Sequence, residues 1–119
     1  MASPPDFPWF TSERLGPVTV VRFSCRTFLE EEPIRQAGER LFRLVDEGCR
    51  KTVLNLAGVQ RVESTMLAKL VALHIRIEAV GGRLALCELT PELYEVFKTL
   101  WLTRSLWIYS TEKDALQTF

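Results

Sequence analysis

Residues 53–71 read VLNLAGVQRVESTMLAKLV, and the order of structural elements can be worked outward from this stretch. Residues 52–56 form a short, mostly apolar run, which is typical of a β-strand covered on both faces. Residues 58–61 follow as a connection, and over residues 64–80 the apolar side chains recur at helical spacing. We therefore predict a strand, a loop and a helix that begins at Ser64. The apolar arc of this helix is expected to contain Leu67, Leu70, Val71, Ile75 and Ile77.

Two strands and a helix are predicted ahead of this stretch. A short edge strand is expected to begin at residues 9–11, and residues 17–25, rich in β-branched and aromatic side chains, are expected to form the next strand. Three consecutive glutamates and Pro33 then precede apolar residues at helical spacing, which is typical of a first helical turn. Because Gly48 supplies a stop, this helix is expected over residues 31–47.

Two strands and two helices are predicted after the quoted stretch. A glycine pair at 81–82 ends the helix, and residues 83–89 form another apolar, strand-like run. Thr90 is a capping hydroxyl ahead of a proline and an acid, which favours a helix start. Residues 106–109 are expected to form the last strand, and a short helix is expected from Thr111. The buried stripe of the helix that follows Thr90 is expected to comprise Leu93, Val96, Phe97 and Leu100.

The order of these elements predicts an α/β fold. Strands that are separated by helices run parallel to one another through crossover connections. We therefore expect a small, mostly parallel mixed sheet of four to five strands with about four helices. A chain of 119 residues has room for one domain, which is assigned to residues 9–119. Residues 1–8 hold three of the six prolines and are expected to form a flexible Pro-rich tail.

The charge and the cysteine content argue against several classes of binding site. Lys plus Arg and Asp plus Glu number 15 each, whereas nucleic-acid binding needs an excess of positive charge. Cys25, Cys49 and Cys87 lack ligand spacing, so neither a metal site nor a disulfide framework is expected. The sequence shows no signal-peptide pattern and no apolar run long enough to span a bilayer. We expect a cytoplasmic protein without direct membrane insertion.

Catalytic signatures are missing from the sequence. It contains no GxxxxGK[ST], GxGxxG or GxSxG pattern, which would indicate a phosphate-binding loop, a dinucleotide-binding turn or a nucleophile elbow. The one histidine, His74, falls on the apolar arc of the helix that begins at Ser64, where a core histidine is expected and Glu78 can pair with it. Few groups are left for acid–base chemistry. We therefore expect no enzyme activity and no cofactor.

Two blocks in the quoted stretch resemble the signature of STAS domains, the family of anti-sigma factor antagonists. Residues 54–59, LNLAGV, resemble the strand with which that signature begins. Residues 62–67, VESTML, resemble the apolar residue followed by Asp-Ser-Ser-Gly-Leu that leads into its helix. Later blocks of the family are matched in the same order by residues 81–86, 89–97 and 106–116. The resemblance covers residues 17–118.

The resemblance implies a regulatory module that binds partner proteins. In antagonists of this kind the first serine of the motif is phosphorylated, and it corresponds to Ser64, with Thr65 as the second choice. The unphosphorylated form binds an anti-sigma factor, usually a serine kinase of the GHKL type, and a phosphatase reverses the modification. The residues implied at the partner-binding site are Glu63, Ser64, Thr65, Met66 and Lys69.

Two interpretations of Ser64 follow from its position. A serine at a helix start can cap the helix by accepting a hydrogen bond from a free backbone N–H. The same position tolerates a phosphate, because free amides and the helix dipole favour an anion there. The sequence alone leaves open whether Ser64 is only a cap or is also a phosphorylation site.

Four residues near Ser64 depart from the family pattern. Glu63 replaces an aspartate, Thr65 replaces a second serine, and Asn55 replaces a common aspartate. Met66 stands where a glycine or another small residue is usual. Its long side chain either packs into the core or alters the choice of partner.

Other functions are compatible with the sequence. The chain could be a STAS scaffold or an accessory subunit of a larger complex, such as a transporter or a stress-signalling assembly, with Ser64 serving only as a cap. It could instead sense a small molecule in the apolar space between sheet and helices; an unrecognised enzyme ranks last. Trp101 and Trp107 are either core residues or aromatic anchors for a partner or a second copy. The expected oligomeric state is a monomer or a weak dimer.

Overall fold

Parallel strands make up most of the central sheet of the computed structural model, which describes residues 8–119. The strand order is β1-β2-β4-β6-β7, in which β1 is antiparallel to β2 and every other neighbouring pair is parallel. A second, two-stranded parallel sheet joins β3 to β5. These results confirm the predicted α/β fold. The strands are β1 (Phe10–Leu15), β2 (Val18–Phe23), β3 (Thr27–Phe28), β4 (Lys51–Asn55), β5 (Arg61–Val62), β6 (Arg83–Cys87) and β7 (Trp107–Tyr109).

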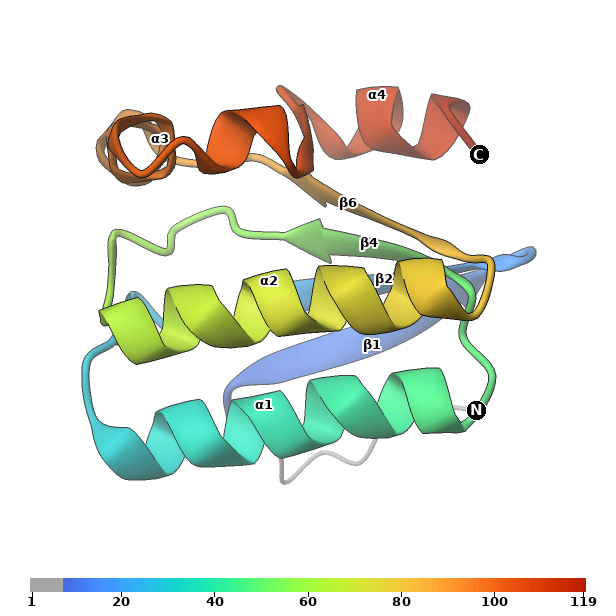
Figure 1. Cartoon of the computed structure of the whole chain (residues 1–119), viewed down its shortest axis with the longest axis horizontal. Helices are drawn as coiled ribbons and strands as arrows, with labels where there is room; N and C mark the ends of the chain where they lie inside the picture. The colour runs from blue at the N-terminus through green and yellow to red at the C-terminus, as the bar shows by residue number, and fades with distance from the viewer. Residues whose placement is uncertain (1–7) are drawn as a thin grey trace.

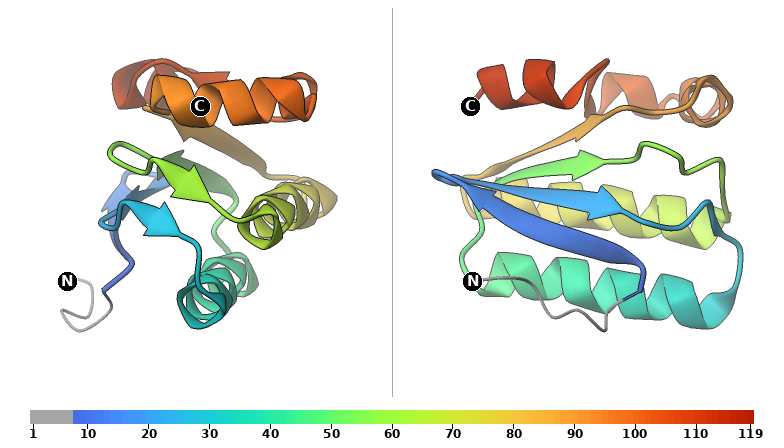
Figure 2. Two further views of the ribbon diagram at one scale, coloured as in Figure 1. Left: turned by 90° about the vertical axis from the view of Figure 1, so that its left-hand side faces the viewer. Right: turned by 180° about the vertical axis from the view of Figure 1, so that it is seen from behind.

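Among residues 8–119, three helices pack on one face of the sheet and a fourth packs on the other. Helices α1 and α2 lie side by side across one face (Figure 1), and in the right-hand view of Figure 2 they lie behind β1 and β2. Leu93 and Phe97 of α3 join the same core, whereas Ala115 of α4 belongs to a smaller core on the opposite face. The helices are α1 (Glu31–Asp46), α2 (Ser64–Ala79), α3 (Pro91–Thr99) and α4 (Glu112–Gln117), with a 3₁₀ turn at Leu102–Arg104.

The two cores follow from the alternation of side chains along the parallel strands. On β4, Leu54 faces the larger core under α1, α2 and α3, while Val53 faces the smaller core under α4. Leu84 and Ala85 of β6 divide in the same way. Because both faces of these strands are covered, consecutive positions are apolar, Val53 and Leu54 on β4 and residues 84–87 on β6, which is the pattern that predicted them.

Helices α1 and α2 begin at the same end of the sheet. Each follows a strand through a crossover connection and runs back along the sheet, so its N-terminus lies near the carboxyl ends of the parallel strands. Both helices begin at the left in Figure 1. Glu31 and Glu32 occupy the first turn of α1, where negative charge is favoured, and Ser64 opens α2. This arrangement brings the two helix starts together.

The predicted elements agree with the observed ones to within about two residues at each end, which is the usual uncertainty of such boundaries. Strands β3 and β5 were not predicted, because two-residue strands show no periodicity. Of the predicted tail at residues 1–8, residues 1–7 lie outside the described residues. No helix within residues 8–119 combines the length and the apolar character that crossing a membrane requires.

The predicted buried stripe of α3 is wrong at two of its four positions. Leu93 and Phe97 are buried, but Val96 and Leu100 are exposed, Leu100 with 51% of its surface. Leu93 and Phe97 are one turn apart and form a single line along this nine-residue helix. Val96 and Leu100 lie to the side of that line, where the rest of the described chain leaves them open to solvent.

The burial of four further side chains tests what the sequence predicted for them. Ile75, expected on the apolar arc of α2, is 61% exposed. His74 is buried as expected for a core histidine, and its Nε2 lies 3.7 Å from the Glu78 carboxylate. Trp101 and Trp107 are exposed, by 64% and 45%, so the interpretation of both as core residues is wrong.

Candidate functional site

Ser64 is the first residue of α2 and its side chain is exposed. The capping position belongs to Glu63, whose backbone is extended (φ −71°, ψ 155°) and whose side chain makes no capping hydrogen bond. The Ser64 hydroxyl has no hydrogen-bond partner among residues 8–119. The interpretation of Ser64 as a helix cap is therefore wrong, because the residue lies one position inside the helix and its oxygen is left free.

The first turn of α2 has unused backbone donors. The amides of Met66 and Leu67 donate to the Glu63 carbonyl, at 2.9 and 3.2 Å. The amides of Ser64 and Thr65, in contrast, donate to no acceptor within the described part of the chain. Free amides and the positive end of the helix dipole make this turn a favourable place for negative charge.

Hydrogen bonds with two other segments hold the loop that leads to Ser64. The Glu63 amide donates to the Phe28 carbonyl at 2.7 Å, next to the pairing of β5 with β3. The Gln60 amide donates to the Arg26 carbonyl at 2.7 Å. On the other side the Thr90 hydroxyl donates to the Val59 carbonyl at 3.2 Å. The position of Ser64 is therefore set by β3 and by the start of α3, as well as by its own helix.

A groove of ≈ 480 Å³ lies beside Ser64, between the start of α1 and the start of α2. We call it the α1–α2 groove. Leu29 supplies exposed apolar surface there, while Glu31 and Glu63 supply carboxylates. Neither carboxylate forms an ion pair within residues 8–119. Its lining residues are Leu29, Glu31, Ile34, Arg35, Glu63, Thr65 and Lys69.

Lys69 crosses from α2 to α1 at this groove. A Cβ atom added to Gly38 of α1 would lie only 2.6 Å from Cδ of Lys69, so the lysine side chain lies directly against that glycine. The aliphatic stem of a lysine covers apolar surface in this way while its ammonium group stays accessible. Lys69 thus closes one side of the groove and leaves a positive charge near Thr65.

The structure brings together four of the five residues predicted for partner binding. Glu63, Thr65 and Lys69 line the α1–α2 groove, and Ser64 is exposed next to them. Met66 differs, because its side chain is only 1% exposed and packs in the larger core. It occupies the side of the first helical turn that faces the sheet. Met66 therefore presents no side chain to a partner, and its assignment to that surface is wrong.

Residues from α1 and its approach complete the groove and were not predicted. Leu29, Glu31 and Ile34 are about thirty residues from Ser64 in the chain, so no local pattern links them to it. Arg35 also lines the groove, and its guanidinium pairs with Glu32 and with Glu39, the latter at 2.7 Å. The acidic start of α1 was the only signal, and it was interpreted as helix stabilisation alone.

Asn55, at the end of β4, makes two hydrogen bonds that an aspartate could not both make. Its Nδ2 donates to Oε1 of Glu112 at 2.8 Å, and its Oδ1 accepts from the Ala57 amide at 2.9 Å. The same Glu112 carboxylate accepts from Nε and Nη2 of Arg22, at 3.0 and 2.8 Å. Asn55 therefore connects the start of α4 to the loop that leads to Ser64.

Solved structures of anti-sigma factor antagonists share this fold. The chain is similar to an antagonist from Mycobacterium paratuberculosis (21% identity, TM-score 0.82, 98% of this chain and 97% of the other covered). It is also similar to an anti-sigma-factor antagonist (STAS) domain protein from Planctomyces limnophilus (25%, 0.79, 92% and 95%). A third similar structure is the Bacillus cell fate determinant SpoIIAA in its phosphorylated form (20%, 0.72, 92% and 97%).

None of the curated protein sequences compared with this chain matches it. A family model does: the model described as the STAS domain matches residues 17–115, which is most of the chain. This range runs from just before β2 to the middle of α4 and includes the loop, Ser64 and the α1–α2 groove. The sequence match and the shared fold agree, and the chain belongs to the STAS domain family.

Proposed function

We propose that this chain is a regulatory protein-binding module of the anti-sigma factor antagonist type, controlled by phosphorylation of Ser64. Its partner is an anti-sigma factor, or a serine kinase of the GHKL type, that docks on the start of α2 and the α1–α2 groove. One observation carries the proposal: the Ser64 hydroxyl is exposed and has no hydrogen-bond partner among residues 8–119. The chain acts by binding, and a phosphatase restores the unmodified form.

The similar structures support this choice of function. Two of them are named as anti-sigma factor antagonists, and the third, SpoIIAA, was solved in a phosphorylated form. A fold of this kind therefore accommodates a phosphate. In this chain, Ser64 corresponds to the serine of the family motif and lies at a helix start with free amides.

The modification should change the surface without disturbing the fold. The Ser64 oxygen is engaged in no contact that a phosphate would break, and the unused amides of the first turn favour an anion. The carboxylates of Glu63 and Glu31 lie on this surface together with the Lys69 ammonium group. Added charge at Ser64 therefore makes the docking surface more negative, while the packing beneath it stays the same.

The size of the electrostatic change is sufficient for a switch. A phosphate adds about −1.5 to −2 charges at neutral pH. A partner carboxylate roughly 6 Å away would be repelled by about 1 to 5 kcal/mol at an effective dielectric constant between about 80 and 20. Since about 1.4 kcal/mol changes an equilibrium constant tenfold, the affinity falls by at least about fivefold.

Phosphorylation with purified kinases tests the proposal directly. The chain is incubated with Mg-ATP and each GHKL-type serine kinase of its source organism, and intact mass and peptide mapping are recorded. We expect one phosphate on Ser64 and none on a Ser64→Ala variant. Ser105→Ala is the matched control, because Ser105 is also exposed and its hydroxyl has no hydrogen-bond partner in the described chain.

Calorimetric titration then measures binding of the same kinase to both forms. The unmodified chain should bind, and the phosphorylated chain should bind at least about fivefold more weakly, a difference of ~1 kcal/mol. A Ser64→Asp variant, which adds one negative charge, should also bind more weakly than the unmodified chain. A phosphate placed elsewhere in the chain would contradict the assignment of Ser64. Equal affinity of the two forms would contradict the switch.

A further inference from the structure

A second depression, of ≈ 470 Å³, lies at the carboxyl ends of β6 and β7. After β6 the chain enters α3, which packs in the larger core, and after β7 it enters α4, which packs on the opposite face of the sheet. Adjacent parallel strands whose following helices lie on opposite faces leave a crevice between the two connections. In open α/β sheets, ligands bind at such switch points.

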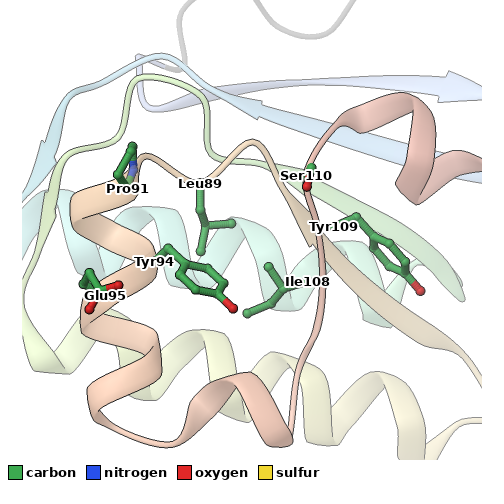
Figure 3. A pocket seen from close by; sticks show the side chains of 7 residues that line it. All are labelled: Leu89, Pro91, Tyr94, Glu95, Ile108, Tyr109 and Ser110. Atoms are coloured by element: carbon green, nitrogen blue, oxygen red, sulfur yellow. The ribbon is translucent and has the colours of Figure 1, made fainter.

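Both connections supply side chains to this β6–β7 crevice. Leu89 and Pro91 come from the segment after β6, Ile108 from β7 and Ser110 from the segment after it. In Figure 3 the Tyr94 ring and the Ile108 side chain point toward one another, with Leu89 beside them. Tyr109 also lines the crevice, but its ring points away from Tyr94 and packs against the smaller core, so Tyr94 is the ring that faces Ile108.

The polar groups of the crevice are free and include one charge. Glu95 lies on the side of Tyr94 away from Ile108 (Figure 3), and it is the one charged side chain that lines the crevice within the described residues. The Glu95 carboxylate and the hydroxyls of Tyr94 and Ser110 have no hydrogen-bond or ion-pair partner in residues 8–119. A carboxylate next to an aromatic ring attracts cations and repels phosphates and carboxylates.

We propose that the β6–β7 crevice binds a small organic cation, that is, an ammonium or guanidinium group carried on an apolar body. The cation pairs with Glu95 and contacts the ring of Tyr94, while the apolar body contacts Leu89 and Ile108. The volume falls within the range of about 300 to 1,000 Å³ that is usual for small-molecule sites. This site shares no lining residue with the α1–α2 groove and does not rest on the function proposed for Ser64.

Three probes with the same aromatic body and different head-group charge test the proposal. Phenethylamine is cationic, 2-phenylethanol is neutral and 3-phenylpropionate is anionic. Each is titrated into the full chain labelled with ¹⁵N, and amide shifts are followed by NMR. We expect phenethylamine to shift the amides of residues 89–95 and 107–110 saturably, 2-phenylethanol to bind more weakly, and 3-phenylpropionate to cause no shifts in these segments.

Two glutamates one turn apart on α3 provide a matched pair of variants. Glu95→Gln should raise the Kd for phenethylamine about tenfold, which corresponds to ~1.4 kcal/mol. Glu92→Gln removes the same charge from an exposed residue that does not line the crevice, and should leave the Kd unchanged. A Tyr94→Leu variant should also bind phenethylamine more weakly, because it lacks the aromatic face.

Three results would overturn the proposal. The first is the absence of saturable shifts with phenethylamine at millimolar concentration. The second is equal or tighter binding of 3-phenylpropionate. The third is an equal loss of affinity in Glu92→Gln and Glu95→Gln, which would indicate general attraction to an acidic helix instead of a site. The melting temperature of each variant confirms that the comparison is made between folded proteins.

Discussion

At the scale of single residues, two hydroxyls at helix starts are used in different ways. Thr90 precedes α3, and its oxygen accepts a hydrogen bond from the Leu93 amide at 3.2 Å while donating to the Val59 carbonyl. Ser64 lies one position further into its own helix, after Glu63, and its oxygen makes no such bond. The Thr90 hydroxyl is therefore part of the fold, whereas the Ser64 hydroxyl is available for modification.

This difference predicts opposite outcomes for two similar alanine variants. Thr90→Ala should lower the free energy of unfolding by about 1 kcal/mol, because a capping bond is lost. Ser64→Ala should change it by less than about 0.5 kcal/mol, as expected for a surface position without a contact. Urea denaturation of both variants measures the two values. An equal loss would restore the interpretation of Ser64 as a structural cap.

Asn55 is a second residue whose side chain is expected to affect the stability of the protein. Asn55→Asp replaces the amide that donates to Glu112 with a carboxylate, which places two negative groups at hydrogen-bonding distance. We expect this variant to lose about 1 to 3 kcal/mol of stability at pH 7, the cost of an unsatisfied and repelling contact. A Glu112→Gln substitution in the same chain should recover part of the loss, since glutamine can donate to aspartate. Denaturation of the four proteins in this double-mutant cycle tests the coupling.

At the scale of secondary-structure elements, α4 depends on contacts with the sheet. It has six residues, which is too short for a stable isolated helix. Arg22 of β2 holds the Glu112 carboxylate, and the Glu88 carboxylate accepts from the Glu112 amide at 2.8 Å. Glu88 adopts a left-handed backbone (φ 61°), which costs about 1 kcal/mol and places its side chain at the start of α4.

The docking of α4 should weaken in acid. The hydrogen-bonded Arg22 guanidinium holds the pKa of the Glu112 carboxyl below its ordinary value. The resulting stability is complete above the unfolded-state pKa of about 4.3 and is lost as the pH falls through the lower folded-state pKa. Glu112→Gln should therefore be less stable than the wild type at pH 7, and the difference should shrink below about pH 4.3.

Urea denaturation between neutral and acidic pH measures this difference. Glu92→Gln is the control, because Glu92 is exposed on α3 and has no ion-pair partner in the described chain. A pH-independent gap between the wild type and Glu112→Gln would show that the Arg22 contact contributes nothing through charge.

At the scale of the whole molecule, the end of the sheet opposite Ser64 determines how closely the parallel strands β4 and β6 approach each other. There, Gly82, which precedes β6, lies against Arg50, which precedes β4. A Cβ atom added to Gly82 would lie 2.2 Å from the Arg50 carbonyl oxygen. The same oxygen accepts from the Arg83 amide at 2.7 Å, next to the pairing of β4 with β6. The register of the two central strands therefore depends on a glycine at this position.

Two glycine-to-alanine variants compare a clash of the new methyl group with a backbone atom and a clash with a flexible side chain. Gly82→Ala should destabilise the protein by about 1 to 3 kcal/mol, because the obstacle is a carbonyl fixed in the sheet. Gly38→Ala meets the Lys69 side chain, which can rotate away, and alanine favours the helix by about 1 kcal/mol relative to glycine. Gly38→Ala should therefore be neutral or stabilising. Thermal melts rank the two, and a larger loss in Gly38→Ala would show that Lys69 is held rigidly.

Signals between neighbouring residues were sufficient to place the four helices of the described chain and the five strands of its main sheet. The cap at Thr90, the acidic first turn at Glu31 and the glycine stop at 81–82 act on the backbone within one or two turns. The family motif around Ser64 is local in the same sense. These features act within short segments, so they can be recognised without knowledge of the fold.

Contacts between distant segments decided the rest of the site. The α1–α2 groove joins Leu29 and Glu31 to Thr65 and Lys69, and the burial of Met66 depends on the sheet beneath α2. The pairing of β3 with β5 and the bond between Asn55 and Glu112 join residues more than thirty positions apart. Periodicity specifies which residues share a face of an element, but only packing determines whether that face is covered, and by which part of the chain.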